Sequence, residues 1–275
     1  MRKTLLMTIF VGLIIGVSSY SNSQSAQAQA RRPDEVTVTG KWVQVGADGE
    51  FKDVVNMVAM DSFLWGVKKD GSLFKMDPNT GKSTQVGDKG SFENLDNLEG
   101  WDHMLWSIES GTLYKNDPKT GKWDQIGKDE SWSKTIDFVG LGNFLYSVEP
   151  DGSLWKTDKN GATTLIDKGD FKGCTLLTEM GGKLWTIEEG TLYETDPNTL
   201  KWRQVGKDGE FKNINAMEGT KSFIFMIDKK GDLYKVDGTG KKTLLGDDYG
   251  DTRILTTLDG RLWTIEKDGT LYKTS

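Results

Sequence analysis

The chain repeats itself with a period of about 40 residues, and this periodicity constrains its fold more than any other feature. A leucine or isoleucine followed by an aromatic residue occurs six times, at Leu64, Leu105, Leu145, Leu184, Ile224 and Leu262. A second leucine-aromatic motif follows in each repeat, at Leu73, Leu113, Leu154, Leu192, Leu233 and Leu271. Within both series the members lie 38 to 41 residues apart. Self-similarity at this period predicts a repeat architecture.

Each repeat contains four short apolar segments, and none of them shows helical periodicity. In the first repeat these segments are VVNMVAM, FLWGV, SLFKM and STQVG, and the turns between them include KKDGS and DPNTGK. Asp-Gly and related turns favour tight hairpins because glycine tolerates a positive φ. Four antiparallel strands per unit in six units predict an all-β fold, a six-bladed β-propeller.

The two ends of the repeat array predict how the ring closes. The last repeat stops after its third apolar segment, whereas an extra segment, residues 41–46, precedes the first inner strand. We expect this N-terminal strand to pair with the last blade, which removes two exposed sheet edges. Cys174 is the only cysteine and cannot form a disulfide within the chain, so closure depends on strand pairing and on the core.

Residues 1–30 have the features of a secretory signal peptide. Arg2 and Lys3 precede a short apolar run, and small residues follow it. We expect cleavage after Ala28 or Ala30, leaving one propeller domain over residues 31–275, secreted or periplasmic and without a membrane span. An uncleaved N-terminal anchor is the alternative. Loss of two bases changes the net charge from −6 to −8, which disfavours nucleic acid and anionic membranes as partners.

The order of short motifs within the repeat points to a family. A loop with Gly-x-Phe leads to an inner strand, followed by Leu-Trp-x-Val, Gly-x-Leu-Tyr-Lys and Trp-x-x-Ile-Gly. Over residues 41–275 this pattern resembles the repeat of tachylectin-type and tectonin-type propeller lectins. The resemblance implies binding of glycans or glycoconjugates at one shallow site per blade or blade junction. The sixth repeat, GDDYGDTRIL, has no phenylalanine at the loop position.

The loops that lead from each outer strand to the next inner strand are the predicted sugar sites. Their aromatic residues are Phe51, Phe92, Trp132, Phe171 and Phe211, and their acids include Asp48, Glu50, Asp129, Asp208 and Glu210. An aromatic face packs on the C–H groups of a pyranose, while carboxylates accept hydrogen bonds from its hydroxyls. Trp132 is the strongest single candidate. The alternative is that these rings fill the gaps between blades.

The remaining aromatic residues carry weaker functional signals. The rings of the second and third strands recur in all six repeats, and we expect them to form the core. The Trp101-Asp102-His103 segment is a local elaboration that either binds a ligand or packs on the surface. A third set consists of Trp42, Trp123 and Trp202, which alternate with Ser83, Thr163 and Lys242. These tryptophans form either rim packing or a peripheral interaction surface.

The chain offers few residues for catalysis. It has one histidine and one cysteine, no Gly-x-Ser-x-Gly, and no Asp-rich calcium loop. Beyond residue 32 its arginines are Arg203, Arg253 and Arg261. The sequence leaves open a pair of catalytic carboxylates of the kind that hydrolyses glycosides. We therefore predict a monomeric lectin that is not an enzyme and uses neither cofactor nor metal. A protein-interaction scaffold is the alternative, and a propeller hydrolase is a further one.

Overall fold

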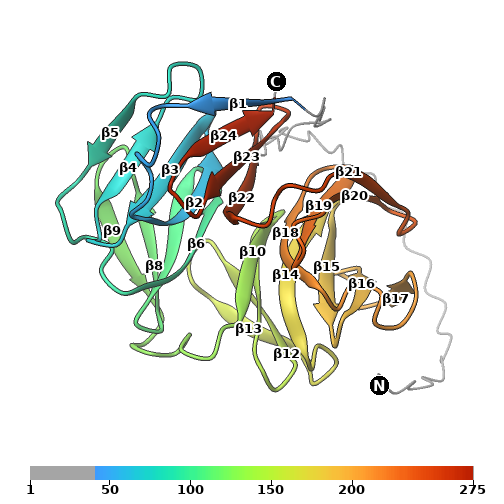
Figure 1. Ribbon diagram of the computed structural model, residues 1–275. Coiled ribbons are helices and arrows are strands. Elements are labelled where there is room, and N and C mark those ends of the chain that lie inside the picture. The colour runs from blue at the N-terminus through green and yellow to red at the C-terminus, as the bar shows by residue number, and fades with distance from the viewer. Residues whose placement is uncertain (1–40, 275) are drawn as a thin grey trace, which may run out of the picture.

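The computed structural model describes residues 41–274 (Figure 1). The predicted signal peptide, residues 1–30, and the stretch 31–40 of the predicted propeller domain lie outside the described residues. The described part contains 24 strands in six four-stranded antiparallel sheets, and none of its elements is a helix. The predicted six-bladed β-propeller is therefore confirmed.

The strands follow one another with short connections. The first twelve are β1 (Trp42–Val45), β2 (Val54–Met60), β3 (Phe63–Lys68), β4 (Leu73–Met76), β5 (Ser83–Val86), β6 (Leu95–Trp101), β7 (Met104–Glu109), β8 (Thr112–Asp117), β9 (Lys122–Ile126), β10 (Asp137–Leu141), β11 (Phe144–Val148) and β12 (Ser153–Asp158). The second twelve are β13 (Thr163–Lys168), β14 (Cys174–Met180), β15 (Lys183–Glu188), β16 (Thr191–Thr195), β17 (Trp202–Val205), β18 (Ile214–Gly219), β19 (Phe223–Asp228), β20 (Leu233–Asp237), β21 (Lys242–Gly246), β22 (Thr252–Leu258), β23 (Arg261–Glu266) and β24 (Leu271–Thr274).

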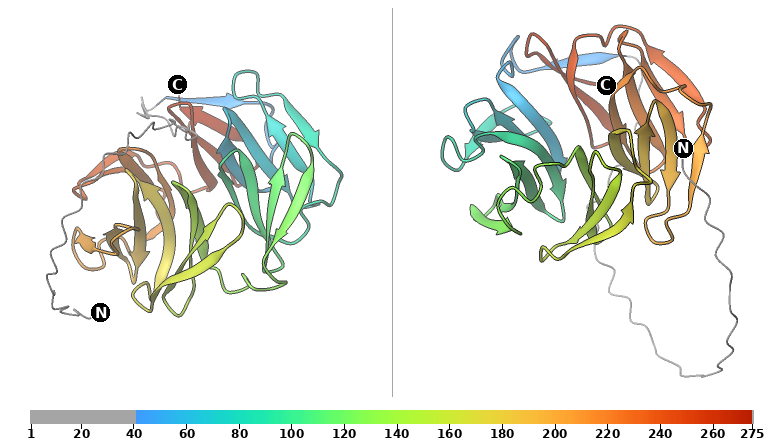
Figure 2. Two further views of the ribbon diagram at one scale, coloured as in Figure 1. Left: turned by 180° about the vertical axis from the view of Figure 1, so that it is seen from behind. Right: turned by 90° about the horizontal axis from the view of Figure 1, so that it is seen from below.

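The blades form a closed ring around their innermost strands. Blade one is β2 to β5, blades two to five follow in groups of four, and blade six is β22 to β24 together with β1. The first strand of each blade contacts the first strands of both neighbours, including the contact between β22 and β2. Figures 1 and 2 show the six sheets arranged around this inner ring.

The second strand of each blade is buried on both faces because it lies between two neighbouring sheets. In β3 four consecutive residues, Leu64 to Val67, are buried. The outer strands differ, since three of the four residues of β5 are exposed. Middle strands with continuous burial and edge strands with polar residues are what packing blade against blade requires.

The N-terminal strand closes the ring as predicted. Strand β1 pairs antiparallel with β24, and the register runs from Trp42 opposite Thr274 to Val45 opposite Leu271. Arg253 adds a second link between blades six and one. Its Nη1 donates a hydrogen bond to the carbonyl oxygen of Val54 at 3.1 Å, and its Nη2 donates one to Phe51 at 3.3 Å.

The hydrophobic core is divided among the blade junctions. Six clusters of buried side chains occur, and each contains residues from the facing sheets of two neighbouring blades. The interior of the protein is thus a series of six equivalent interfaces.

Candidate functional site

The loops predicted to bind sugar carry one aromatic ring per blade junction, and all of these rings are buried. Phe51, Phe92, Phe171 and Phe211 are 1–2% exposed, and Trp132 is 6% exposed. Tyr249 takes this position at the sixth junction, where the sequence has no phenylalanine. An aromatic ring therefore lies in this loop at all six blade junctions.

The backbone fixes these loops in the same way at every junction. The amide of each loop aromatic donates a hydrogen bond of 2.8–3.1 Å to a glycine carbonyl oxygen in the turn between the second and third strands. These glycines all have positive φ, and a Cβ at Gly190 would lie 2.5 Å from the Cβ of Lys212. The close approach of two turns explains why glycine recurs there.

Burial of the rings corrects the expectation that they stack on a sugar. Phe51 packs against Phe74 with 6.0 Å between ring centroids, and Trp132 belongs to the cluster with Trp106 and Phe138. Rings that are 1–6% exposed leave little surface on which a pyranose can stack, although Phe92 borders a groove between blades one and two. The alternative interpretation, in which Phe51, Phe92, Trp132, Phe171 and Phe211 fill the gaps between blades, describes the structure.

The predicted acids are exposed, but they stabilise their own loops and lie at three separate junctions. Three aspartates accept a hydrogen bond from a glutamine side chain, in the pairs Gln44–Asp48, Gln125–Asp129 and Gln204–Asp208 at 2.7, 2.7 and 2.8 Å. Glu50 and Glu210 accept hydrogen bonds from the amides of Ala47 and Lys207 at 3.0 and 2.9 Å. The structure does not bring these five acids together into one site.

A groove opens instead at the rim between blades one and two. This rim groove has a volume of about 260 Å³ and is lined by Leu73, Val86, Gly87, Asp88, Ser91, Phe92, Asn116, Gly121 and Trp123. Its floor is aromatic, because Trp123 packs on Phe92 with 4.4 Å between ring centroids. Trp123 remains partly exposed. The volume lies just below the ~300–1,000 Å³ typical of pockets for drug-sized ligands.

One lining residue of the rim groove has an unsatisfied polar atom. Asn116 is 3% exposed, and its side-chain oxygen Oδ1 has no hydrogen-bond partner among residues 41–274. Asn116 lies directly opposite Trp123 in the β8–β9 pairing, so both side chains are on the sheet face toward blade one. A buried acceptor of this kind costs about 1–3 kcal/mol unless a partner reaches it.

The same arrangement recurs in alternate blades. Thr195 occupies the equivalent position in blade four, opposite Trp202, and its buried hydroxyl also lacks a partner in the described part of the chain. In blade six the equivalent hydroxyl has a partner, because Thr274 Oγ1 accepts a hydrogen bond of 3.1 Å from the amide of Leu262. The alternating tryptophans noted in the sequence thus mark the even-numbered blades.

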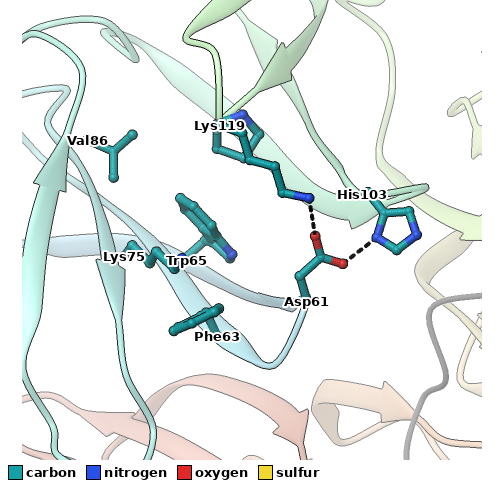
Figure 3. A pocket seen from close by; sticks show the side chains of 8 residues that line it. Asp61, Phe63, Trp65, Lys75, Val86, His103 and Lys119 are labelled. Carbon is teal, nitrogen blue, oxygen red and sulfur yellow. Dashed lines mark hydrogen bonds and ion pairs between the residues drawn. The ribbon is translucent and has the colours of Figure 1, made fainter.

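A second groove lies at the same junction, on the face that carries the turns between first and second strands. This face groove has a volume of about 460 Å³ and is lined by Asp61, Phe63, Trp65, Lys75, Val86, His103, Pro118 and Lys119 (Figure 3). Asp61 and His103 lie in two-residue turns whose residues all have positive φ, the signature of type I′ hairpins. These tight turns place the two side chains side by side.

The polar end of the face groove is a cluster of three charged or titratable groups. The Asp61 carboxylate contacts Nδ1 of His103 and lies 3.6 Å from Nζ of Lys119. Figure 3 shows these three side chains converging at one end, with Phe63 and Trp65 toward the other. Lys75 lies over the Phe63 ring, with its Nζ 3.5 Å from the centroid. The predicted Trp101-Asp102-His103 segment therefore contributes His103 to this groove.

Sequence reasoning missed most residues of both grooves. Asp61, Lys75 and Lys119 lie at turn or strand positions where a charged residue is ordinary. The available signal was the departure from the repeat, since residue 103 is histidine in blade two and serine, asparagine or glycine in the other blades. The contact between Asp61 and His103 joins two turns that are 42 residues apart, and only the assembled junction reveals it.

Burial raises the pKa of three partly buried carboxylates within residues 41–274, Glu109, Asp137 and Glu266, and none of them lines either groove. Burial raises the pKa of Glu109 to about 7, against a hydrogen bond of 2.6 Å from the Ser107 hydroxyl. Burial also raises the pKa of Asp137 to about 6, although its carboxylate accepts hydrogen bonds from the amides of Leu177 and Phe138. Asp137 thereby links the inner strands of blades three and four.

Each groove is lined by a single carboxylate, Asp61 in one and Asp88 in the other. Within residues 41–274, no group of three or more histidine, cysteine, aspartate or glutamate side chains is placed to hold a metal ion. The same residues include no helix with the length and hydropathy that a bilayer crossing requires.

Comparison with known proteins defines the class. No family model matches the sequence, and no curated protein matches it significantly. Solved structures with the same fold include a Bacteroides thetaiotaomicron protein of unknown function, with 14% identity, a TM-score of 0.62, and coverage of 86% of this chain and 72% of that one. A calcium-binding regucalcin from Agrobacterium tumefaciens has 14% identity and a TM-score of 0.60, with coverage of 84% of this chain and 94% of that one. Virginiamycin B lyase from Staphylococcus aureus has 9% identity and a TM-score of 0.57, with coverage of 85% of this chain and 97% of that one.

These similarities establish a β-propeller and nothing finer. At 9–14% identity, neither the calcium binding nor the lyase activity of those proteins transfers to this chain. None of the three is described as a lectin, so the resemblance to tachylectins and tectonins stays a prediction.

Proposed function

We propose that this protein is an exported, monomeric and non-catalytic carbohydrate-binding propeller of the tachylectin and tectonin kind, and that it binds a sugar ring in the rim groove. The unsatisfied Oδ1 of Asn116 beside the partly exposed ring of Trp123 carries the proposal. Both residues lie at the junction of blades one and two.

The chemistry of the rim groove suits a sugar. A pyranose places its C–H groups on the indole of Trp123 and donates one hydroxyl to the Oδ1 of Asn116. Ser91 and Asp88 supply further polar groups at the groove margin. A sugar hydroxyl supplies the hydrogen-bond partner that Oδ1 of Asn116 lacks among residues 41–274.

Binding at this one junction is weak by itself. A groove for a single ring supports a dissociation constant in the roughly millimolar to micromolar range. The equivalent pair in blade four, Thr195 and Trp202, forms a second and more open position, with Trp202 41% exposed. Two positions on one disc increase the avidity for a glycan-coated surface without requiring tight binding at either one.

A glycan array followed by calorimetric titration of the sugar selected tests the proposal. Trp123→Ala removes the stacking surface and is expected to abolish binding to that sugar. Trp132→Phe is the matched control, because it keeps an aromatic plug at a different junction and leaves the rim groove intact. Silence on the array, together with one tight protein partner in a pull-down, would favour the interaction scaffold.

A further inference from the structure

The two grooves at the junction of blades one and two adjoin each other. Val86 lines both of them. The β8–β9 connection also borders both, with Pro118 and Lys119 at the face groove and Gly121 at the rim groove. A ligand longer than one sugar ring therefore has a continuous path from the rim groove toward the face groove.

The two grooves differ in charge. The face groove contains two lysines against one carboxylate, whereas Asp88 is the charged residue of the rim groove, and Asp61 already faces His103 and Lys119. Lys75 lies 3.5 and 5.3 Å from the centroids of Phe63 and Trp65, and within residues 41–274 it forms no ion pair with a carboxylate. A patch with excess positive charge stands out on a chain whose net charge is −6.

We propose that the natural ligand is an acidic oligosaccharide, with a neutral sugar in the rim groove and the adjacent carboxylate-bearing sugar in the face groove. The inference rests on the proposed sugar binding and specifies the ligand class. The carboxylate of the second sugar lies near Lys119 and Lys75, and its C–H groups face Phe63. Asp61 orients His103 and Lys119 rather than binding the ligand.

The charges that line the groove decide the preference for an acidic ligand, because dissolved salt screens charges elsewhere on the protein. The Debye length is about 8 Å at physiological ionic strength, so distant acids contribute little at the groove. A polyanion such as nucleic acid does not fit the same pattern, since Asp61 and Asp88 lie along the path. An acidic sugar in the face groove, beside Lys75 and Lys119, and a neutral sugar in the rim groove, beside Asp88, match the charges of the two grooves.

Calorimetric titration with two tetrasaccharides of equal length tests the inference. Hyaluronan tetrasaccharide alternates a uronate with an N-acetylhexosamine, whereas chitotetraose contains only the uncharged N-acetylhexosamine. We expect the wild-type chain to bind the acidic tetrasaccharide more tightly, and to lose this advantage as the salt concentration rises.

Two lysine variants and one control locate the effect. Lys75→Met and Lys119→Met are each expected to weaken binding of the acidic tetrasaccharide by about 3–5-fold and to leave chitotetraose unchanged. Lys156→Met is the matched control, because Lys156 lies over Phe144 in blade three in the same manner, 4.6 Å from the ring centroid. It is expected to change neither affinity.

The outcomes separate this inference from the proposed function. Equal affinity for both tetrasaccharides, unaffected by either lysine variant, overturns the acidic ligand and leaves sugar binding in place. If Trp123→Ala loses chitotetraose binding and the wild type shows no preference for the acidic tetrasaccharide, sugar binding in the rim groove likewise stands and the acidic ligand is overturned. Failure of both tetrasaccharides and of the whole array overturns both proposals.

Discussion

Replacement of Asn116 by leucine separates binding from stability. Asn116 is 3% exposed, and its Oδ1 accepts no hydrogen bond from any group within residues 41–274. Removing such an acceptor recovers about 1–3 kcal/mol of unfolding free energy, and the adjacent groove of about 260 Å³ leaves room for the larger apolar side chain. For a domain of this size, each kcal/mol raises the melting temperature by about 2–4 °C.

The assay combines thermal unfolding with sugar titration. Asn116→Leu is expected to melt higher than the wild type and to lose affinity for the sugar, because the ligand hydroxyl no longer has its acceptor. Thr195→Val is the matched control in blade four, where the buried hydroxyl also lacks a partner. It is expected to raise the melting temperature while binding in the rim groove persists. An Asn116→Leu protein that is destabilised and still binds sugar would refute the reasoning.

Three further predictions concern stability. Deletion of residues 31–46 removes β1 and is expected to lower the melting temperature markedly, because β24 loses its partner; an unchanged value would contradict the closure. Arg253→Met is expected to lower the free energy of unfolding in urea by about 1–3 kcal/mol through loss of its bonds to Val54 and Phe51, and an unchanged midpoint would count against it. The raised pKa of Glu109, about 7, favours the folded state below pH 4.5, and this contribution is lost as the pH rises through 7. The free energy of unfolding of Glu109→Gln should therefore rise relative to that of the wild type between pH 4.5 and 7. Unfolding free energies of the two proteins that run parallel over this pH range would disprove this.

Sequence periodicity was enough to predict the ring, because each blade repeats the same local signals. The recurring rings of the second strands were predicted to form the core, and all six of them are buried. The missing outer strand of the last repeat predicted the pairing of residues 41–46, which the register of β1 with β24 confirms. These inferences depend only on neighbours within one repeat or at its ends.

The site could not be predicted in the same way, because it depends on how two blades meet. Recurrence of Phe51 and its equivalents is compatible with sugar binding or with filling a junction, and only the depth of the rings decides between them. Trp123 was identified as a rim residue, but its pairing with Asn116 requires the strand register. The contact of Asp61 with His103 likewise arises between turns of different blades.

The most direct test is a nuclear magnetic resonance titration of the tryptophan indole signals with the sugar selected on the array. The Trp123 signal, assigned through Trp123→Phe, is expected to shift with increasing sugar, while the buried Trp132 signal stays in place. A shift confined to Trp132, or saturating sugar that moves neither signal, would contradict binding in the groove between blades one and two.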